Sequence, residues 1–198
     1  MTPEKLRQIY GDVSPLAAAK EITRFDDHCR AFIAQSPFLL MATSNGQHLD
    51  VSPKGDPAGF VQVESDTTLL IPDRPGNNRI DGLLNILAHP QVALLFMIPT
   101  VTETLRVNGT AEISDDPALC DQFQIKGRSP KTVTRVTAQQ IFTHCGKAPL
   151  RAGLWSPDSW PSERPVATLY QMIRDHADMQ VPSTAQSYTD QRYRDTLY

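Results

Sequence analysis

The middle of the chain is a succession of short apolar segments separated by turn residues, and no other feature limits the fold as strongly. Segments of strand length run from residue 38 to residue 144, and Asn45-Gly46 between the first two is a strong hairpin signal. A second hairpin is expected from residues 60–63 and 67–71. About six or seven short strands with few long helices between them favour an antiparallel barrel over a sheet of βαβ units.

A later strand is expected to have one polar face. Residues 103–113 alternate between apolar and polar side chains, with Thr104 and Arg106 on the polar side. That side faces either solvent on the outside of the barrel or the lining of a pocket. The remaining strands are expected at residues 92–98, 132–136 and 140–144.

Helices are expected at both ends of the chain and in two connections. Ser14-Pro15 is a plausible N-cap with a first-turn proline, and it predicts one amphipathic helix that continues to Ser36-Pro37. Further helices are expected over residues 80–87, 117–123 and 165–178, followed by a polar tail over residues 183–198. The chain is interpreted as one domain, with a helical N-terminal extension (about 1–36), a barrel (about 37–145) and a C-terminal helical region (about 146–198).

Composition excludes several classes of function. The 198 residues carry a net charge of −3, which gives no general attraction to nucleic acid or to anionic lipid. Cys29, Cys120 and Cys145 are far apart and lack CxxC spacing, so neither a disulfide framework nor a metal site is expected. No apolar run approaches the length of a membrane span and the N-terminus does not resemble a signal peptide, so a cytoplasmic protein is expected.

Two turns carry exposed cationic and amide side chains, one over residues 50–56 and one over residues 71–79. Arg79 lies where a Gly-Asn-Asn turn enters a helix, so backbone N–H groups, the positive helix end and a guanidinium group can meet on one phosphate. A solvated arginine beside an ordinary loop fits this turn equally well. Lys54 follows Ser52-Pro53 at a strand end, where a lysine more often only improves solubility.

A second group of cations lies near the C-terminal end of the barrel. Lys147 and Arg151 are four residues apart and lie on one side if the segment is helical, with Trp155 one turn further. Two cations beside an aromatic ring can hold a phosphate and a ring system, and an exposed basic face is equally consistent. For His144-Cys145 a structural role is favoured, because no second Cys or His has metal-ligand spacing. The chain also lacks the GxGxxG and GxxxxGK[ST] motifs of the Rossmann and P-loop sites.

The two turns together with the segment Arg106-Val107-Asn108-Gly109-Thr110-Ala111 resemble the FMN-binding split barrel of the pyridoxamine 5'-phosphate oxidase superfamily. The likeness covers about residues 20 to 175 and is greatest to a subgroup of uncharacterised flavoproteins. It implies a mainly β fold, a six- to seven-stranded antiparallel split barrel of Greek-key-like order with peripheral helices. It also implies a homodimer with FMN bound at the subunit interface.

The resemblance also implies roles for individual residues. Those matching flavin-contacting positions of the family are Val51, Ser52, Pro53, Lys54, Pro72, Asp73, Asn78, Arg79 and Thr104, with Asn78 and Arg79 at the phosphate. Arg106 is expected to line the same site, and Lys147, Arg151 and Trp155 are expected to complete it from the partner subunit. The chain has no counterpart of the arginine-rich C-terminal segment that holds pyridoxal phosphate in the true oxidase, so the vitamin B6 reaction itself is not expected.

The resulting expectation is an FMN-dependent oxidoreductase that takes a hydride or electrons from a small substrate or from NAD(P)H. The flavin carries out the chemistry, which agrees with the absence of a catalytic triad motif. The alternative is a flavin- or haem-binding protein for storage or sensing that does not turn over. A haem would need an axial ligand such as His48, His89 or His144.

Overall fold

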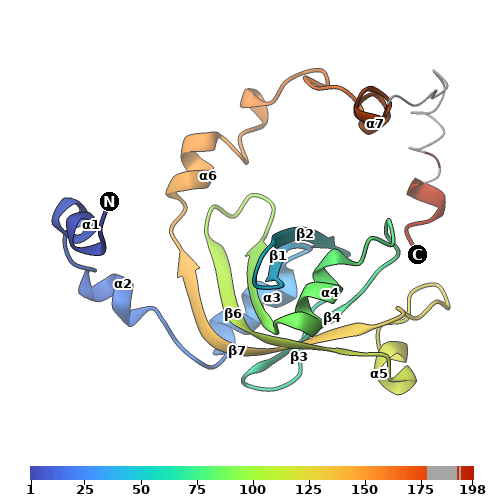
Figure 1. Ribbon diagram of the computed structural model, residues 1–198, viewed down its shortest axis with the longest axis horizontal. Helices are drawn as coiled ribbons and strands as arrows, with labels where there is room; N and C mark the ends of the chain where they lie inside the picture. The colour runs from blue at the N-terminus through green and yellow to red at the C-terminus, as the bar shows by residue number, and fades with distance from the viewer. Residues whose placement is uncertain (178–190, 192) are drawn as a thin grey trace.

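The protein has a mainly β architecture built on one antiparallel sheet with helices around it (Figure 1). The computed structural model describes residues 1–177, 191 and 193–198. Its sheet has seven strands in the order β2-β1-β5-β6-β7-β4-β3. The strands are β1 (Phe38–Ser44), β2 (Leu49–Gly55), β3 (Gln62–Val63), β4 (Thr68–Pro72), β5 (Gln91–Met97), β6 (Thr104–Ser114) and β7 (Val133–His144). The predicted antiparallel, barrel-like fold is confirmed.

Local turn chemistry sets the register of the first hairpin. The side-chain oxygen Oδ1 of Asn45 accepts hydrogen bonds from the backbone N–H groups of Gln47 and His48, at 2.9 and 2.8 Å. Gly46 adopts a φ of 89°, a left-handed conformation that a side chain would oppose. The turn pairs β1 with β2 from Ser44 opposite Leu49 to Phe38 opposite Gly55. The predicted hairpins at both positions, β1–β2 and β3–β4, are confirmed.

Alternation along the central strands separates an inner face from an outer face. Every second residue of β1, β5 and β6 is buried. The inner face packs against Ile33 of α3 (Asp27–Gln35) and Ile86 of α4 (Asp81–Ala88). The fully buried inner residues include Leu39, Leu94, Phe96, Leu105, Val107 and Ile141. Removing these side chains from water is the main stabilising contribution to the fold.

The sheet curls without closing, because its two edge strands, β2 and β3, do not pair with each other. Two ion pairs bridge the gap between the end of β2 and the segment that follows β4. Lys54 Nζ lies 2.7 Å from Asp73 Oδ1, and Arg74 Nε lies 2.6 Å from Asp56 Oδ2. The two turns singled out in the sequence therefore meet across the split.

The sequence predicts the division of the chain into elements wrongly in two places. The single helix expected from Pro15 onwards is two helices, α2 (Pro15–Ala19) and α3, because Ile22 leaves the helical path and pairs with Ile141 of β7. Asp26 then starts α3 afresh as its N-cap, and its carboxylate accepts a hydrogen bond from the Cys29 N–H at 2.8 Å.

The strands expected at residues 132–136 and 140–144 are one continuous strand, β7. It pairs with β6 along its length, and an irregularity between Asn108 and Gly109 takes up one extra residue. The polar residues between the two apolar stretches thus lie in the strand and not in a loop.

The remaining helices lie at the periphery of the sheet. They are α1 (Pro3–Tyr10), α5 (Pro117–Asp121), α6 (Lys147–Ala152), a 3-10 turn (Pro157–Ser159) and α7 (Leu169–Ala177). Asp116 caps α5, which ends at Asp121, two residues before the predicted end. The segment from α6 to α7 arches away from the sheet (Figure 1).

The predicted end of α7 at residue 178 and most of the predicted polar tail lie outside the described residues. Among the described helices, none has the length and apolar character needed to cross a membrane.

Candidate functional site

The split between β2 and β4 holds paired charges of unequal burial. The Asp56 side chain is 1% exposed and that of Arg74 is 15% exposed. Arg74 also donates a hydrogen bond to the carbonyl oxygen of Phe123 at 2.8 Å, so the role of this arginine is structural. Lys54 and Asp73 are 23% and 25% exposed, so this pair joins the turns and still reaches solvent.

The first turn of α4 is open. Ile80, at the N-cap, and Asn78 both have left-handed backbone conformations, with φ of 54° and 58°. No side chain caps this helix, whereas Thr2, Ser14, Asp26 and Asp116 cap α1, α2, α3 and α5. The first N–H groups of α4 therefore keep the positive end of the helix available to an anion.

Arg79 lies beside this open helix start. Its side chain is 74% exposed and its Nε lies 2.7 Å from Asp81 Oδ2. The hydrogen bond and the charge of Asp81, with a smaller contribution from Asp50, raise the pKa of Arg79. An exposed pair of this kind contributes little to stability, so the guanidinium is free to turn toward a ligand.

The inner side of β2 faces the same helix start. Ser52 Oγ donates a hydrogen bond to Asp50 Oδ2 at 2.7 Å. A Cβ atom at Gly82 would lie 3.3 Å from that carboxylate oxygen, a tight contact, so the glycine eases the close approach of α4 to β2. Asp50 and Gly82 were missed as site residues in the sequence. The alternation of β2, which puts Asp50 on the same side as Ser52, is the signal that identifies Asp50.

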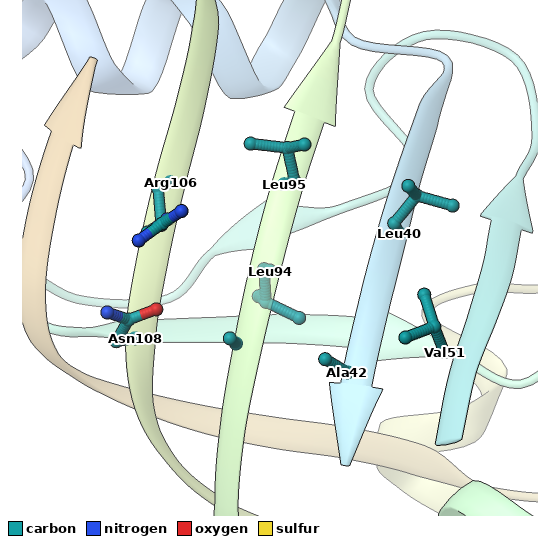
Figure 2. Close-up of a pocket in the computed structure, with 8 residues that line it drawn as sticks. Leu40, Ala42, Val51, Leu94, Leu95, Arg106 and Asn108 are labelled. Atoms are coloured by element: carbon teal, nitrogen blue, oxygen red, sulfur yellow. The ribbon is translucent and has the colours of Figure 1, made fainter. Parts of the chain in front are cut away.

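A pocket of about 490 Å³ lies on the opposite, outer face of the sheet (Figure 2). Its floor comes from β2, β1 and β5, and β6 supplies its polar end through Arg106 and Asn108. The floor residues include Leu40, Ala42, Val51, Ala93 and Leu95. The polar side predicted for β6 thus lines a pocket and does not simply face solvent.

Beside this pocket, β6 and β7 carry interacting polar and aromatic side chains. The Arg106 guanidinium carbon lies 5.3 Å from the centre of the Phe142 ring, and the His144 ring centre lies 5.1 Å from that of Phe142. Burial, and then the charges of Arg106 and Lys20, lower the pKa of His144. His144 Nε2 is buried and has no hydrogen-bond partner among the described residues.

The cations after β7 lie on a helix, as predicted. Lys147 and Arg151 are exposed on α6. Trp155 is anchored to the β5–β6 connection, because its indole N–H donates a hydrogen bond to the carbonyl oxygen of Val101 at 2.9 Å. Their expected role in a partner's site remains a prediction.

The structure divides the remaining predicted residues between the two faces of the sheet. Ser52, Lys54 and Asp73 lie at the inner side of β2 and at the split, where the loop carrying Asn78 and Arg79 also begins. Val51 and Pro53 alternate with Ser52 and Lys54 and are exposed on the outer face. Pro72 is fully buried opposite Val133, and Thr104 pairs with His144 at the start of β6.

Within the described residues no group of His, Cys, Asp or Glu side chains has an arrangement suited to a metal ion.

A model of the family described as pyridoxamine 5'-phosphate oxidase matches residues 25–145, more than half of the chain. The chain belongs to the pyridoxamine 5'-phosphate oxidase family. The match covers the sheet, α3, α4 and α5, and it ends just before α6.

Solved structures resemble the chain at low sequence identity. HupZ of Group A Streptococcus is 21% identical, covers 60% of this chain and 93% of its own, and has a TM-score of 0.49. General Stress Protein 26 of Bacillus anthracis is 15% identical, covers 58% and 89%, and has a TM-score of 0.46. The FAD binding protein of Mycobacterium smegmatis is 17% identical, covers 62% and 97%, and has a TM-score of 0.42. No curated protein matches the chain.

Proposed function

We propose that the chain is an FMN-binding flavoprotein and an oxidoreductase with a small-molecule substrate or NAD(P)H as electron donor. Membership of the family supports a flavin as the cofactor. The observation that carries the proposal is the uncapped start of α4 with the exposed Arg79 beside it. This combination of N–H groups, helix dipole and guanidinium suits the doubly charged phosphate of FMN.

The residues around the split fit this role in different ways. Arg79, Asn78 and the first N–H groups of α4 hold the phosphate, with Arg79 exchanging Asp81 for the ligand. Lys54 is kept in place by Asp73 at the edge of the same site. The bound flavin supplies the redox chemistry, so the chain's own task is to bind and orient it and to set the polarity around it.

We also propose that the protein works as a homodimer whose subunits complete each other's flavin sites. The segment from α6 to α7 leaves the sheet and exposes large apolar side chains along its length (Figure 1). These side chains include Leu150, Trp160, Val166, Leu169 and Ile173. A second subunit is the partner expected to cover them and to receive Lys147 and Arg151, and light scattering of the purified protein tests this.

Replacing Arg79 tests the phosphate site. Arg79→Ala is expected to give a folded and largely colourless protein, because the remote phosphate contributes much of the binding energy of a flavin. The visible spectrum measures bound flavin, and mass analysis of the released chromophore identifies FMN. Arg24→Ala is the matched control, since Arg24 is also exposed and paired with a single aspartate. Stoichiometric flavin in the Arg79 variant would contradict the assignment.

Turnover is tested separately from binding. The flavin of an oxidoreductase should bleach when NADH or NADPH is added without oxygen, and its yellow colour should return in air. A protein for storage or sensing should stay oxidised throughout. A Soret band in the purified protein would instead identify the haem-binding alternative.

A further inference from the structure

The C-terminal segment, residues 193–198, reaches the split of the sheet and lies beside the loop that leads from β4 to α4 (Figure 1). Tyr198 makes this contact. Its hydroxyl donates a hydrogen bond to Asp56 Oδ1 at 2.6 Å, and the centre of its ring lies 5.9 Å from the guanidinium carbon of Arg74. A side chain 142 positions from Asp56 in the chain is therefore joined to the buried ion pair at the split.

Asp56 has one hydrogen-bond donor on each of its carboxylate oxygens. Arg74 Nε lies 2.6 Å from Oδ2, and the Tyr198 hydroxyl binds Oδ1. The Asp56 side chain is 1% exposed, so a donor lost from either oxygen is costly to replace. The hydrogen bond to Asp56, then burial and the charge of Asp56, raise the pKa of Tyr198. The hydroxyl therefore stays protonated and remains a donor at neutral pH.

A tight turn over residues 125–128 also holds Tyr198. The backbone groups of Ile125 and Arg128 exchange hydrogen bonds of 3.0 and 2.9 Å, and the two residues between them have left-handed φ values. Lys126 Nζ lies 5.4 Å from the centre of the Tyr198 ring, a distance at which a cation is attracted to the ring. Arg128 donates a hydrogen bond to the main-chain oxygen of Tyr198. Tyr198 is thus held through its hydroxyl, its ring and its main chain.

The rest of the C-terminal segment is attached loosely. Tyr193 and Leu197 are 51% and 58% exposed, so they bury little apolar surface. A cavity of about 160 Å³ remains between the segment and the 125–128 turn. Tyr198 therefore carries most of the attachment. The contacts of one side chain can break and form again while the sheet stays folded.

The ion pair that Tyr198 joins lies at the base of the loop that carries Asn78 and Arg79. Arg74 follows shortly after the end of β4, and Asp56 follows the end of β2. Fixing Arg74 fixes the direction in which the loop leaves the sheet. A change at Tyr198 can therefore reach the loop through Asp56 and Arg74.

We propose that the C-terminal segment is a latch that closes on the split through Tyr198 and restrains the loop between β4 and α4. Tyr198 is a positioning residue: it supplies one donor to Asp56, Asp56 holds Arg74, and Arg74 fixes the base of the loop. The closed latch keeps Asn78 and Arg79 in place for a phosphate, and the open latch lets the loop move and the ligand exchange. The effect on phosphate binding rests on the proposed flavin function, whereas the restraint of the loop does not.

Hydrogen–deuterium exchange of the loop, residues 73–80, tests the restraint. Tyr198→Ala should raise the exchange rate of the loop about threefold or more. Tyr198→Phe keeps the ring and lacks the hydroxyl, so it should raise the rate less. Arg128→Gln should act in the same direction, because Arg128 binds Tyr198 from the 125–128 turn. Exchange in β5 should stay unchanged, which separates local release of the loop from general unfolding.

Tyr193→Ala is the matched control, since Tyr193 lies in the same segment and is exposed. It should leave the exchange of the loop unchanged. Titration of the flavin-free protein measures the link to the phosphate site. The affinity for FMN should fall about fivefold in Tyr198→Ala, and the affinity for riboflavin, which lacks the phosphate, should change less than about twofold.

Equal exchange of the loop in Tyr198→Ala and Tyr193→Ala would overturn the latch, regardless of flavin content. Faster exchange of β5 together with the loop would also overturn it, because Tyr198 would then stabilise the whole fold and not the loop. Faster exchange of the loop with unchanged FMN affinity would overturn the link to the phosphate site. An unaltered protein that binds no FMN would refute the proposed function instead, and the exchange rates would still decide the latch.

Discussion

His144 is expected to make the stability of this protein depend on pH near neutrality. Burial lowers the pKa of His144 from its ordinary value of 6.5, and the charges of Arg106 and Lys20 lower it further. Between the folded and the unfolded pKa, the unfolded chain binds a proton that the folded protein does not bind. The free energy of unfolding therefore rises with pH across that window and falls as the solution is acidified.

We predict that His144→Gln removes this contribution. The free energy of unfolding, measured by urea denaturation, should fall between about pH 7.5 and about pH 5.5 more steeply in the unaltered protein than in the variant. Glutamine keeps a polar group at the position and cannot titrate in this range. Parallel pH profiles for the two proteins would show that His144 is not held neutral by its surroundings.

At the scale of the elements, the sequence correctly predicted those turns and strands whose formation depends on neighbouring residues. The conformation of the turn between β1 and β2 is determined by Asn45 and Gly46 themselves. The alternation around Arg106 likewise identifies a strand with one polar face. The break between α2 and α3 could not be found in this way. It depends on Ile22 pairing with Ile141, a residue more than a hundred positions away, and that pairing overrides the helical pattern.

The long pairing of β6 with β7 depends on a glycine at its irregularity. A Cβ atom at Gly109 would overlap the carbonyl oxygen of Thr137 on β7. We predict that Gly109→Ala lowers the free energy of unfolding by about 3 kcal/mol, because the two strands must separate to admit the methyl group. Urea denaturation measures the change.

Gly76→Ala is the matched control for Gly109→Ala. Gly76 lies in a loop, its added Cβ would have ordinary room at 4.0 Å from the nearest atom, and its φ is not left-handed. Its substitution should change stability by less than about 0.5 kcal/mol. Equal effects of the two substitutions would mean that β6 and β7 have room to adjust.

At the scale of the whole molecule, the sequence placed the candidate residues on the right turns and strands but not on the right faces. Ser52 and Val51 are adjacent, and only the docking of α4 against β2 decides that Ser52 meets the helix start while Val51 meets the outer pocket. The pairing of Asp56 with Arg74 was missed for the same reason. In the sequence, both residues resemble the charged residues found in many exposed turns. They pair only because the curl of the sheet brings the two turns together.

That pairing leads to the last prediction. Asp56 is almost completely buried and accepts hydrogen bonds from Arg74 Nε and from the Tyr198 hydroxyl, both at 2.6 Å. Asp56→Asn removes the charge that balances Arg74 and should lower the free energy of unfolding by about 3 kcal/mol. Asp66→Asn, at exposed ion pairs with arginines, should cost less than about 1 kcal/mol. Urea denaturation measures both, and similar costs would mean that solvent or a neighbouring group already compensates Arg74 at the split.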